Sequence, residues 1–256
     1  MRGVRAGLAC GSMDISELIS ANTRYCAVLG HPVRHSASPA MQNAGFCALG
    51  LPWRYLAFDV EPGGLASAIA GAKAMKFIGL NLTVPHKVAA VGMMDELDET
   101  ARRLGAVNTV RFEARDESGV WRPLGQFDEV RGLEVRSVGF NTDADAVSRV
   151  IKSDLGVELR GAVALVLGAG GAGRTAALQL AAEGVGELWL VNRTVAKAEA
   201  LAAEIRQRWL GVKVQIGYPA CAVDVIINAT SLGLGRDDPL PFDPKVFDMK
   251  RAKSVF

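Results

Sequence analysis

The feature of this sequence that most restricts its fold is a glycine-rich turn in its second half. The apolar run VALVL leads directly into a GxGxxG pattern, and a stretch rich in alanine and leucine follows. Between a strand and a helix, such glycines allow a tight turn and bring backbone amides close to a pyrophosphate, which the positive end of the helix attracts. A plain strand-to-helix turn is the alternative. The residues expected to hold a dinucleotide are Gly168, Ala169, Gly170, Gly171, Ala172 and Gly173.

The residues at the end of the next apolar run predict which dinucleotide binds. An NAD enzyme usually places an acidic residue there, against the ribose 2′-hydroxyl, whereas this chain has Asn192, Arg193 and Thr194. Arginine can meet a 2′-phosphate, threonine can donate a hydrogen bond to it, and Lys197 adds positive charge one turn later. The sequence therefore favours NADP. Solvated surface charges are the alternative interpretation of Arg193 and Lys197.

Short β-like runs alternate with longer helical runs from Tyr25 onward, which is typical of α/β proteins with parallel strands and helical crossovers. Residues 86–97 (HKVAAVGMMDEL) are expected to be helical, and residues 115–137 to form a hairpin or an exposed loop. A length of 256 residues favours two domains. We expect an N-terminal extension (1–22), an α/β substrate-binding and catalytic domain (23–142) and a Rossmann-like NADP-binding domain with a parallel sheet (143–256).

Composition excludes several function classes. The 29 basic and 27 acidic residues nearly cancel, so no net field draws the chain to nucleic acid or to an anionic membrane. The four cysteines are scattered without CxxC spacing and the three histidines lie close to the N-terminus, which predicts neither a disulfide framework nor a metal site. No apolar run approaches the roughly 18 residues that a membrane-spanning helix needs. We therefore expect a cytoplasmic enzyme, monomeric or homodimeric, with a small-molecule substrate.

Polar residues gather where the apolar runs of the N-terminal half end. The carboxyl ends of strands in an open α/β sheet border the ligand crevice, so these groups are expected to converge on one polyhydroxylated, anionic substrate. Serine hydroxyls suit a carboxylate, whereas asparagine, lysine and aspartate suit ring hydroxyls. The residues are Ser36 and Ser38 in HSASP, Asn81, Thr83 and Lys87 in NLTVPHK, Asn108 in GAVNT and Asp143 in GFNTD.

Each of these clusters has a simpler interpretation. Ser38 before a proline is a common helix start, and Asp143 can cap a helix. Asn81 and Asn108 can tie down turns, and Lys87 can be a surface charge. Any one of these interpretations is credible alone. All of them together are less so, because the residues gather where a sheet opens its cleft.

Seven motifs, in one order, carry a resemblance to a known family: GHPVRHSASP, GLNLTVPHK, GAVNT, GFNTD, GAGGAGRT, VNRT and INATSLG. On these motifs, which run from about Thr23 to Gly233, the chain closely resembles the shikimate dehydrogenases of the shikimate/quinate dehydrogenase family. The resemblance implies reversible reduction of 3-dehydroshikimate to shikimate by NADPH, a step of chorismate and aromatic amino-acid biosynthesis.

The resemblance also implies roles for single residues. The two serines would hold the substrate carboxylate. Lys87 would be the leading acid/base, and Asp143 would mainly orient the substrate within a shared proton network. The substrate would be held by Ser36, Ser38, Asn81, Thr83, Lys87, Asn108 and Asp143, and the cofactor by the glycine turn with Asn192, Arg193, Thr194, Lys197, Asn228 and Thr230.

The sequence departs from the family pattern at three places. Family members usually continue into a last strand, a tyrosine-containing loop and a GxxMLxxQ-like helix, whereas this sequence stops at SVF. We therefore expect a chain that lacks the C-terminal segment, with one substrate contact and part of the nicotinamide wall missing. Ala144 and Ala146 stand where glycines often follow NTD, and residues 115–137 are longer than the usual hairpin.

Three other functions stay open. A quinate/shikimate dehydrogenase would accept an extra substrate hydroxyl and often prefers NAD, against which Arg193 argues. Without a C-terminal segment, the chain is alternatively a noncatalytic protein that binds NADP or shikimate. A folate- or tRNA-linked reductase would explain the glycine turn but leaves HSASP and NLTVPHK unexplained.

Overall fold

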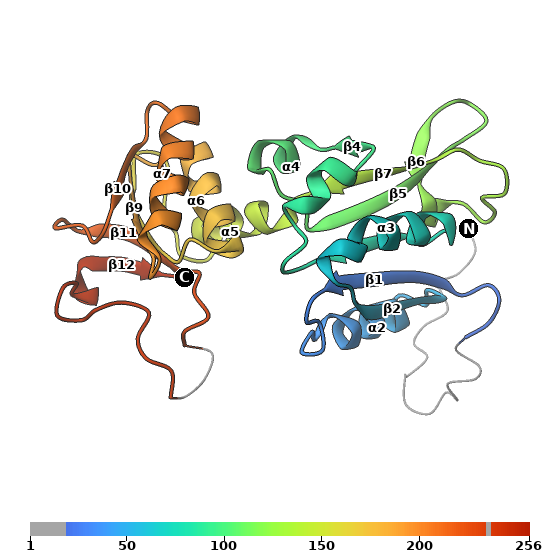
Figure 1. Ribbon diagram of the computed structural model, residues 1–256, viewed down its shortest axis with the longest axis horizontal. Helices are drawn as coiled ribbons and strands as arrows, with labels where there is room; N and C mark the ends of the chain where they lie inside the picture. The colour runs from blue at the N-terminus through green and yellow to red at the C-terminus, as the bar shows by residue number, and fades with distance from the viewer. Residues whose placement is uncertain (1–18, 234–236) are drawn as a thin grey trace. The chain divides into compact units, whose positions relative to one another are not determined.

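Two compact units, divided between Asn141 and Thr142, make up the computed structural model (Figure 1). The structure describes residues 19–233 and 237–256, so most of the expected extension, residues 1–22, lies outside the described residues. Each unit is built on its own β-sheet. No helix in the described ranges combines the length and the apolar character needed to cross a membrane. In those same ranges, no cluster of three or more histidine, cysteine or acidic side chains has the arrangement of a metal site.

The N-terminal unit contains a seven-stranded sheet in the order β2-β1-β3-β5-β7-β4, with β6 paired to β5. Its strands are β1 (Arg24–Gly30), β2 (Trp53–Asp59), β3 (Gly79–Leu82), β4 (Glu96–Leu97), β5 (Thr109–Arg115), β6 (Trp121–Pro123) and β7 (Val135–Phe140). Its α-helices are α2 (Ser38–Ala48), α3 (Leu65–Ala74) and α4 (Glu99–Leu104), and its 3₁₀ turns are η1 (Pro62–Gly64), η2 (Ala89–Met93) and η3 (Leu124–Gln126).

Strand direction in this sheet differs in part from the expected parallel arrangement. Strands β1, β2 and β3 are parallel, with α2 and α3 as crossovers, but β5 runs antiparallel to both β3 and β7. Parallel neighbours need a crossover, whereas antiparallel neighbours can be joined by a hairpin or loop. Residues 116–134 between β5 and β7 hold only β6 and a 3₁₀ turn, which permits the antiparallel pairing.

The prediction of a helix over residues 86–97 is also wrong. This segment forms the 3₁₀ turn η2 and then strand β4, which pairs with β7. Gly92 lies inside the apolar stretch, and glycine weakens a helix by about 1 kcal/mol relative to alanine. Pairing of Glu96 and Leu97 with β7 takes the end of the segment into the sheet instead.

Alternate residues of the central strands pack on opposite faces of this sheet. On β1, Ala27 and Leu29 belong to the core that α3 covers, together with Phe112 of β5. The intervening Cys26 and Val28 belong to a smaller cluster under α2. This period of two is the normal consequence of strand geometry. The predicted polar residues lie in the loops at the ends of strands β1, β3 and β5.

The C-terminal unit is an all-parallel sheet of five strands in the order β10-β9-β8-β11-β12. Counted from β8, this is the order 3-2-1-4-5 of the dinucleotide-binding fold, and the direction of winding reverses between β8 and β11. Strands β10 and β12 were not predicted. The elements are β8 (Val163–Leu167), β9 (Glu187–Val191), β10 (Lys213–Ile216), β11 (Val223–Asn228), β12 (Ala252–Val255), α5 (Thr142–Ser153), α6 (Gly171–Ala182), α7 (Val195–Arg208) and the 3₁₀ turn η4 (Met249–Arg251).

Candidate active site

A pocket of about 210 Å³ lies at the end of β1, in the loop that leads to α2. Ser36, Ser38 and Thr83 all line it, with His35 beside them. Ser38 begins α2 after the capping residue Ala37, and the Ser36 Oγ accepts the Ser38 N–H at 3.3 Å. Ser36, Ser38 and Thr83 each bring a hydroxyl group to the residues that line the pocket, and a hydroxyl can donate to a small anion.

A glycine brings the two loops of this pocket together. If Gly30 carried a Cβ, that atom would lie 2.4 Å from the Thr83 methyl carbon, closer than real contacts allow. The backbone N–H of Thr83 donates to the Leu29 carbonyl at 3.0 Å, which extends the pairing of β1 and β3 past the strand ends. Glycine at position 30 thus lets the NLTVPHK loop pack against the end of β1 and places Thr83 beside the serines.

Lys87 is half-buried in the loop after β3, on backbone that its neighbours hold in place. Its carbonyl accepts the N–H of Val107 at 2.8 Å. The preceding residue, His86, is only 1% exposed, and its Nε2 lies 2.8 Å from the Val60 carbonyl oxygen. The sequence patterns did not single out His86, although a histidine between a proline and a lysine in an apolar loop is a signal. Its ring fixes the loop that carries Lys87.

Asn81 and Asn108 lie next to each other, where β3 ends and β5 begins. The Asn81 Nδ2 lies 3.4 Å from the Asn108 carbonyl oxygen and 3.1 Å from the Thr109 Oγ1. Its Oδ1 accepts the hydroxyl of Tyr55 at 2.6 Å. Asn108 is 6% exposed, and its carbonyl also accepts the Leu82 N–H at 2.8 Å. Tyr55 was not predicted, although an inward-facing tyrosine needs a partner for its hydroxyl.

Asp143 lies in the C-terminal unit, in the first turn of α5 together with Asp145. Acidic side chains in a first turn are stabilised by the positive end of the helix. The structure therefore groups the predicted substrate residues. Ser36, Ser38 and Thr83 share a pocket, Asn81 contacts the carbonyl of Asn108, and Asp143 lies near the start of the second unit.

The glycine turn between β8 and α6 combines two close backbone approaches with open space. Gly168 has φ +104°, and a Cβ there would lie 2.8 Å from the Ala229 carbonyl oxygen. A Cβ at Gly173 would lie 2.0 Å from the Gly168 carbonyl oxygen, so strand and helix approach too closely for any side chain. Gly170 and Gly171, by contrast, face open space. No side chain caps α6, so its first N–H groups are presented to that space.

The turn after β9 carries the basic residues that were predicted to bind a phosphate. Arg193, Thr194 and Lys197 are all exposed around the start of α7, and the first turn of that helix holds no acidic residue. Asn192 lies between the two turns: its Oδ1 accepts the Ala169 N–H at 2.9 Å and its Nδ2 donates to the Thr194 carbonyl at 2.8 Å. Asn192 thus joins the glycine turn to the basic turn.

Asn228 and Thr230 lie where β11 ends, beside the glycine turn. The Asn228 Oδ1 accepts the Thr230 hydroxyl at 2.7 Å and its N–H at 3.1 Å. The intervening Ala229 donates its N–H to the Leu167 carbonyl at 2.9 Å, and its own carbonyl is the one closest to Gly168. The two polar residues therefore border the point at which the winding of the sheet reverses.

Comparison with known proteins assigns both units. The family model for the shikimate dehydrogenase substrate binding domain matches residues 28–110, and the one for shikimate / quinate 5-dehydrogenase matches residues 149–233. A curated relative, the shikimate dehydrogenase (NADP(+)) of Methanopyrus kandleri, is 40% identical over 89% of this chain and 74% of its own length. The chain belongs to the shikimate dehydrogenase family.

Solved shikimate dehydrogenases have the same architecture. The enzyme from Aquifex aeolicus matches with a TM-score of 0.71 and 34% identity, over 93% of this chain and 79% of that one. The shikimate 5-dehydrogenase of Thermus thermophilus, solved in complex with NADP(H) and shikimate, matches with a TM-score of 0.63 and 38% identity, over 82% and 70%. The family resemblance and the two-domain α/β fold predicted from the motifs are confirmed.

Proposed function

We propose that this chain catalyses the reversible, NADP-dependent reduction of 3-dehydroshikimate to shikimate. The observation that carries the proposal is the pocket shared by Ser36, Ser38 and Thr83. Three hydroxyl groups around one small cavity suit the carboxylate of a small acid such as shikimate. A family member of similar fold has been solved with shikimate and NADP(H).

In this proposal the residues of the chain bind the substrate and move one proton. NADP, when bound, accepts or supplies the hydride. Lys87 takes the proton from the hydroxyl, or returns it, on the same carbon. Asp143 orients the substrate, and Asn81 and Asn108 meet the remaining ring hydroxyls. The serines fix the carboxylate, so that the reacting carbon is held in one place.

The same proposal assigns the cofactor residues. The first N–H groups of α6 and the glycine turn at residues 168–173 meet the pyrophosphate. Arg193, Thr194 and Lys197 meet the 2′-phosphate, while Asn192 holds their turn against the glycine turn. Asn228 and Thr230 complete the cofactor site. An NAD enzyme usually has an acidic residue where β9 ends, and the presence there of Asn192, Arg193 and Thr194 supports NADP over NAD.

Two further features belong to the proposal. Cys26 and Cys221 carry free thiols, which the reducing cytoplasm preserves. We therefore place the enzyme in the cytoplasm.

Its assembly as a monomer or a homodimer stays a prediction, which size-exclusion chromatography with light scattering checks.

The experiment follows NADPH absorbance as the purified chain is mixed with shikimate and NADP, with quinate and NAD as parallel substrates. We expect turnover with shikimate and NADP, and at least about tenfold less with either substitute. Faster turnover with quinate and NAD would establish the quinate/shikimate alternative. Thermal stabilisation by NADP and shikimate without turnover would instead indicate a noncatalytic binding protein.

The role of Lys87 is tested by the Lys87→Met variant. Because the variant retains a side chain of similar length but has no proton to exchange, we expect kcat to fall by about 10²-fold or more. Shikimate binding is measured separately by calorimetry and is expected to persist. A variant that keeps most of the wild-type turnover would remove Lys87 from the proton step.

A further inference from the structure

Tyr55 fixes the orientation of the Asn81 side chain. The Tyr55 hydroxyl donates to the Asn81 Oδ1 at 2.6 Å, and the Asn81 Nδ2 lies 3.4 Å from the Asn108 carbonyl oxygen. A carbonyl oxygen can only accept, so the amide nitrogen must face Asn108 and the amide oxygen must face Tyr55. The same Nδ2 lies 3.1 Å from the Oγ1 of Thr109, so this one side chain joins strands β2, β3 and β5.

The backbone of the same tyrosine is held by a helix. The Asn43 Oδ1 accepts the Tyr55 N–H at 2.9 Å, and the Asn43 Nδ2 donates to the Tyr55 carbonyl at 2.9 Å. That nitrogen also donates to the Pro39 carbonyl at 2.8 Å, in the first turn of α2 and next to Ser38. Tyr55 is therefore hydrogen-bonded through its hydroxyl to Asn81, which contacts Asn108, and through its backbone to Asn43, which contacts Pro39 at the start of α2.

The surroundings of Tyr55 preserve this arrangement. Tyr55 is 3% exposed, and Phe46 and Trp53 pack in the same cluster. Burial, with a smaller contribution from Cys26, raises the pKa of Tyr55 to about 12, so the hydroxyl stays protonated and donates throughout the neutral range. Asn81 borders a pocket of about 280 Å³, which gives its amide room to rotate once the hydroxyl is removed.

We propose that Tyr55 is a positioning residue of the substrate site. Its hydroxyl holds the Asn81 amide against Asn108, and its backbone, through Asn43, ties this contact to the start of α2, next to Ser38. The inference rests on the proposed function, because shikimate is the ligand whose binding reports it. Tyr55 itself touches neither substrate nor cofactor in this scheme. It acts by keeping the residues that bind ring hydroxyls in register with those that bind the carboxylate.

The first test compares Tyr55→Phe with wild type. Loss of one hydrogen bond that holds a binding residue is expected to raise KM and Kd for shikimate roughly three- to tenfold. The values of kcat and of KM for NADP should stay within about twofold, since the lost contact affects binding and not the proton step. Tyr25→Phe is the matched control, because Tyr25 packs on Phe77 in the core on the opposite face. It should leave all four constants unchanged.

A double-mutant cycle shows whether Tyr55 acts through Asn81. In an Asn81→Ala background, Tyr55→Phe is expected to cause no further rise in Kd for shikimate, because the group it positions is gone. A full additional effect in that background would overturn the inference, as would a Tyr55→Phe enzyme with wild-type KM and Kd. Calorimetry needs no turnover. If the wild type binds shikimate but is inactive, the Kd values of the variants therefore still test the role of Tyr55. A wild type that binds no shikimate overturns the proposed function, and the inference with it.

Discussion

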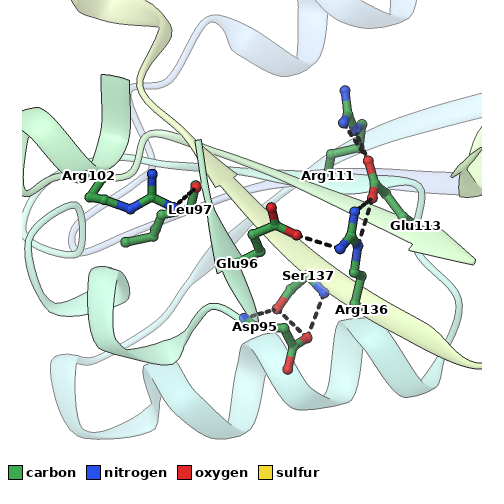
Figure 2. A network of polar contacts seen from close by, with 8 residues as sticks. All are labelled: Asp95, Glu96, Leu97, Arg102, Arg111, Glu113, Arg136 and Ser137. Carbon is green, nitrogen blue, oxygen red and sulfur yellow. Dashed lines mark hydrogen bonds and ion pairs between the residues drawn. The ribbon is translucent and has the colours of Figure 1, made fainter. Parts of the chain in front are cut away.

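At the scale of single residues, Glu113 is a charged side chain that lies buried in the protein. Its side chain is 4% exposed and accepts hydrogen bonds from the Nε of Arg111 at 2.8 Å and the Nε of Arg136 at 2.9 Å (Figure 2). Arg111 lies 4.6 Å over the ring of Phe140, and Arg136 lies 4.5 Å over that of Trp121. A buried carboxylate is tolerated only when paired and hydrogen-bonded in this way.

We expect Glu113→Gln to lower the free energy of unfolding by about 1–3 kcal/mol, because two guanidinium groups lose the charge between them. Urea unfolding followed by circular dichroism measures this. Glu134→Gln is the control: the Glu134 side chain is 66% exposed and lies 3.8 Å from Arg115, so its loss should have no measurable effect. Equal stability of Glu113→Gln and wild type would show that the buried charge contributes nothing.

At the scale of elements, the turn between β8 and α6 contains glycines of two kinds: some allow close packing of the backbone, and others border open space. A Cβ at Gly173 would collide with the Gly168 carbonyl, whereas one at Gly171 would meet nothing in the protein. We expect Gly173→Ala to lower stability by about 1–3 kcal/mol, because strand and helix must move apart. Gly171→Ala should keep the melting temperature of wild type and still weaken NADP binding, since its Cβ enters the space that the pyrophosphate takes.

Melting curves and calorimetric titration with NADP distinguish the two variants. If Gly171→Ala bound NADP as tightly as wild type, the open space at the start of α6 would not be the pyrophosphate site. If Gly173→Ala were as stable as wild type, the close approach of strand and helix would be relieved at no cost.

The elements that sequence patterns predict are those defined by local periodicity and punctuation. Strand β8 and helix α6 follow from an apolar run, a glycine turn and an alanine-rich stretch. The sequence does not predict the antiparallel direction of β5. That direction depends on whether the segment joining β5 to β7 contains a crossover helix. In the candidate site, the motifs identify Ser36 and Thr83, which the structure places in one pocket. Sequence patterns do not identify Asn43 and Tyr55, because the two residues come into contact only when α2 packs against β2.

At the scale of the whole molecule, both units contain carboxylates whose pKa is lowered. Burial alone would raise the pKa of Asp95, but a hydrogen bond from Lys73 and those from Ser137 outweigh it. Figure 2 shows the contacts between Asp95 and Ser137. For Asp224, the hydrogen bond from Lys253 is the largest cause, followed by the backbone N–H of Val163. A carboxylate with a depressed folded-state pKa stabilises the fold above its unfolded pKa, and this contribution is lost as pH falls through the folded value.

We therefore expect the melting temperature to change little between pH 7 and about pH 5 and to fall below about pH 4, near the unfolded pKa of aspartate. Scanning calorimetry across this range measures it. Asp224→Asn removes one of the groups responsible, so its curve should lie below that of wild type at neutral pH and approach it in acid. A constant gap between the two curves would mean that Asp224 does not contribute to the acid dependence.

The contact between Asn43 and Tyr55 also closes part of an exposed sheet edge. Strand β2 is the last strand on its side of the sheet, and Leu56 and Phe58 on it are each 41% exposed. An apolar edge with outward N–H and C=O groups is a template on which further strands assemble. The Asn43 amide occupies both groups of Tyr55, as a neighbouring strand would. The edge of the sheet is therefore closed at Tyr55 by a side chain, and a strand from outside cannot pair with that residue.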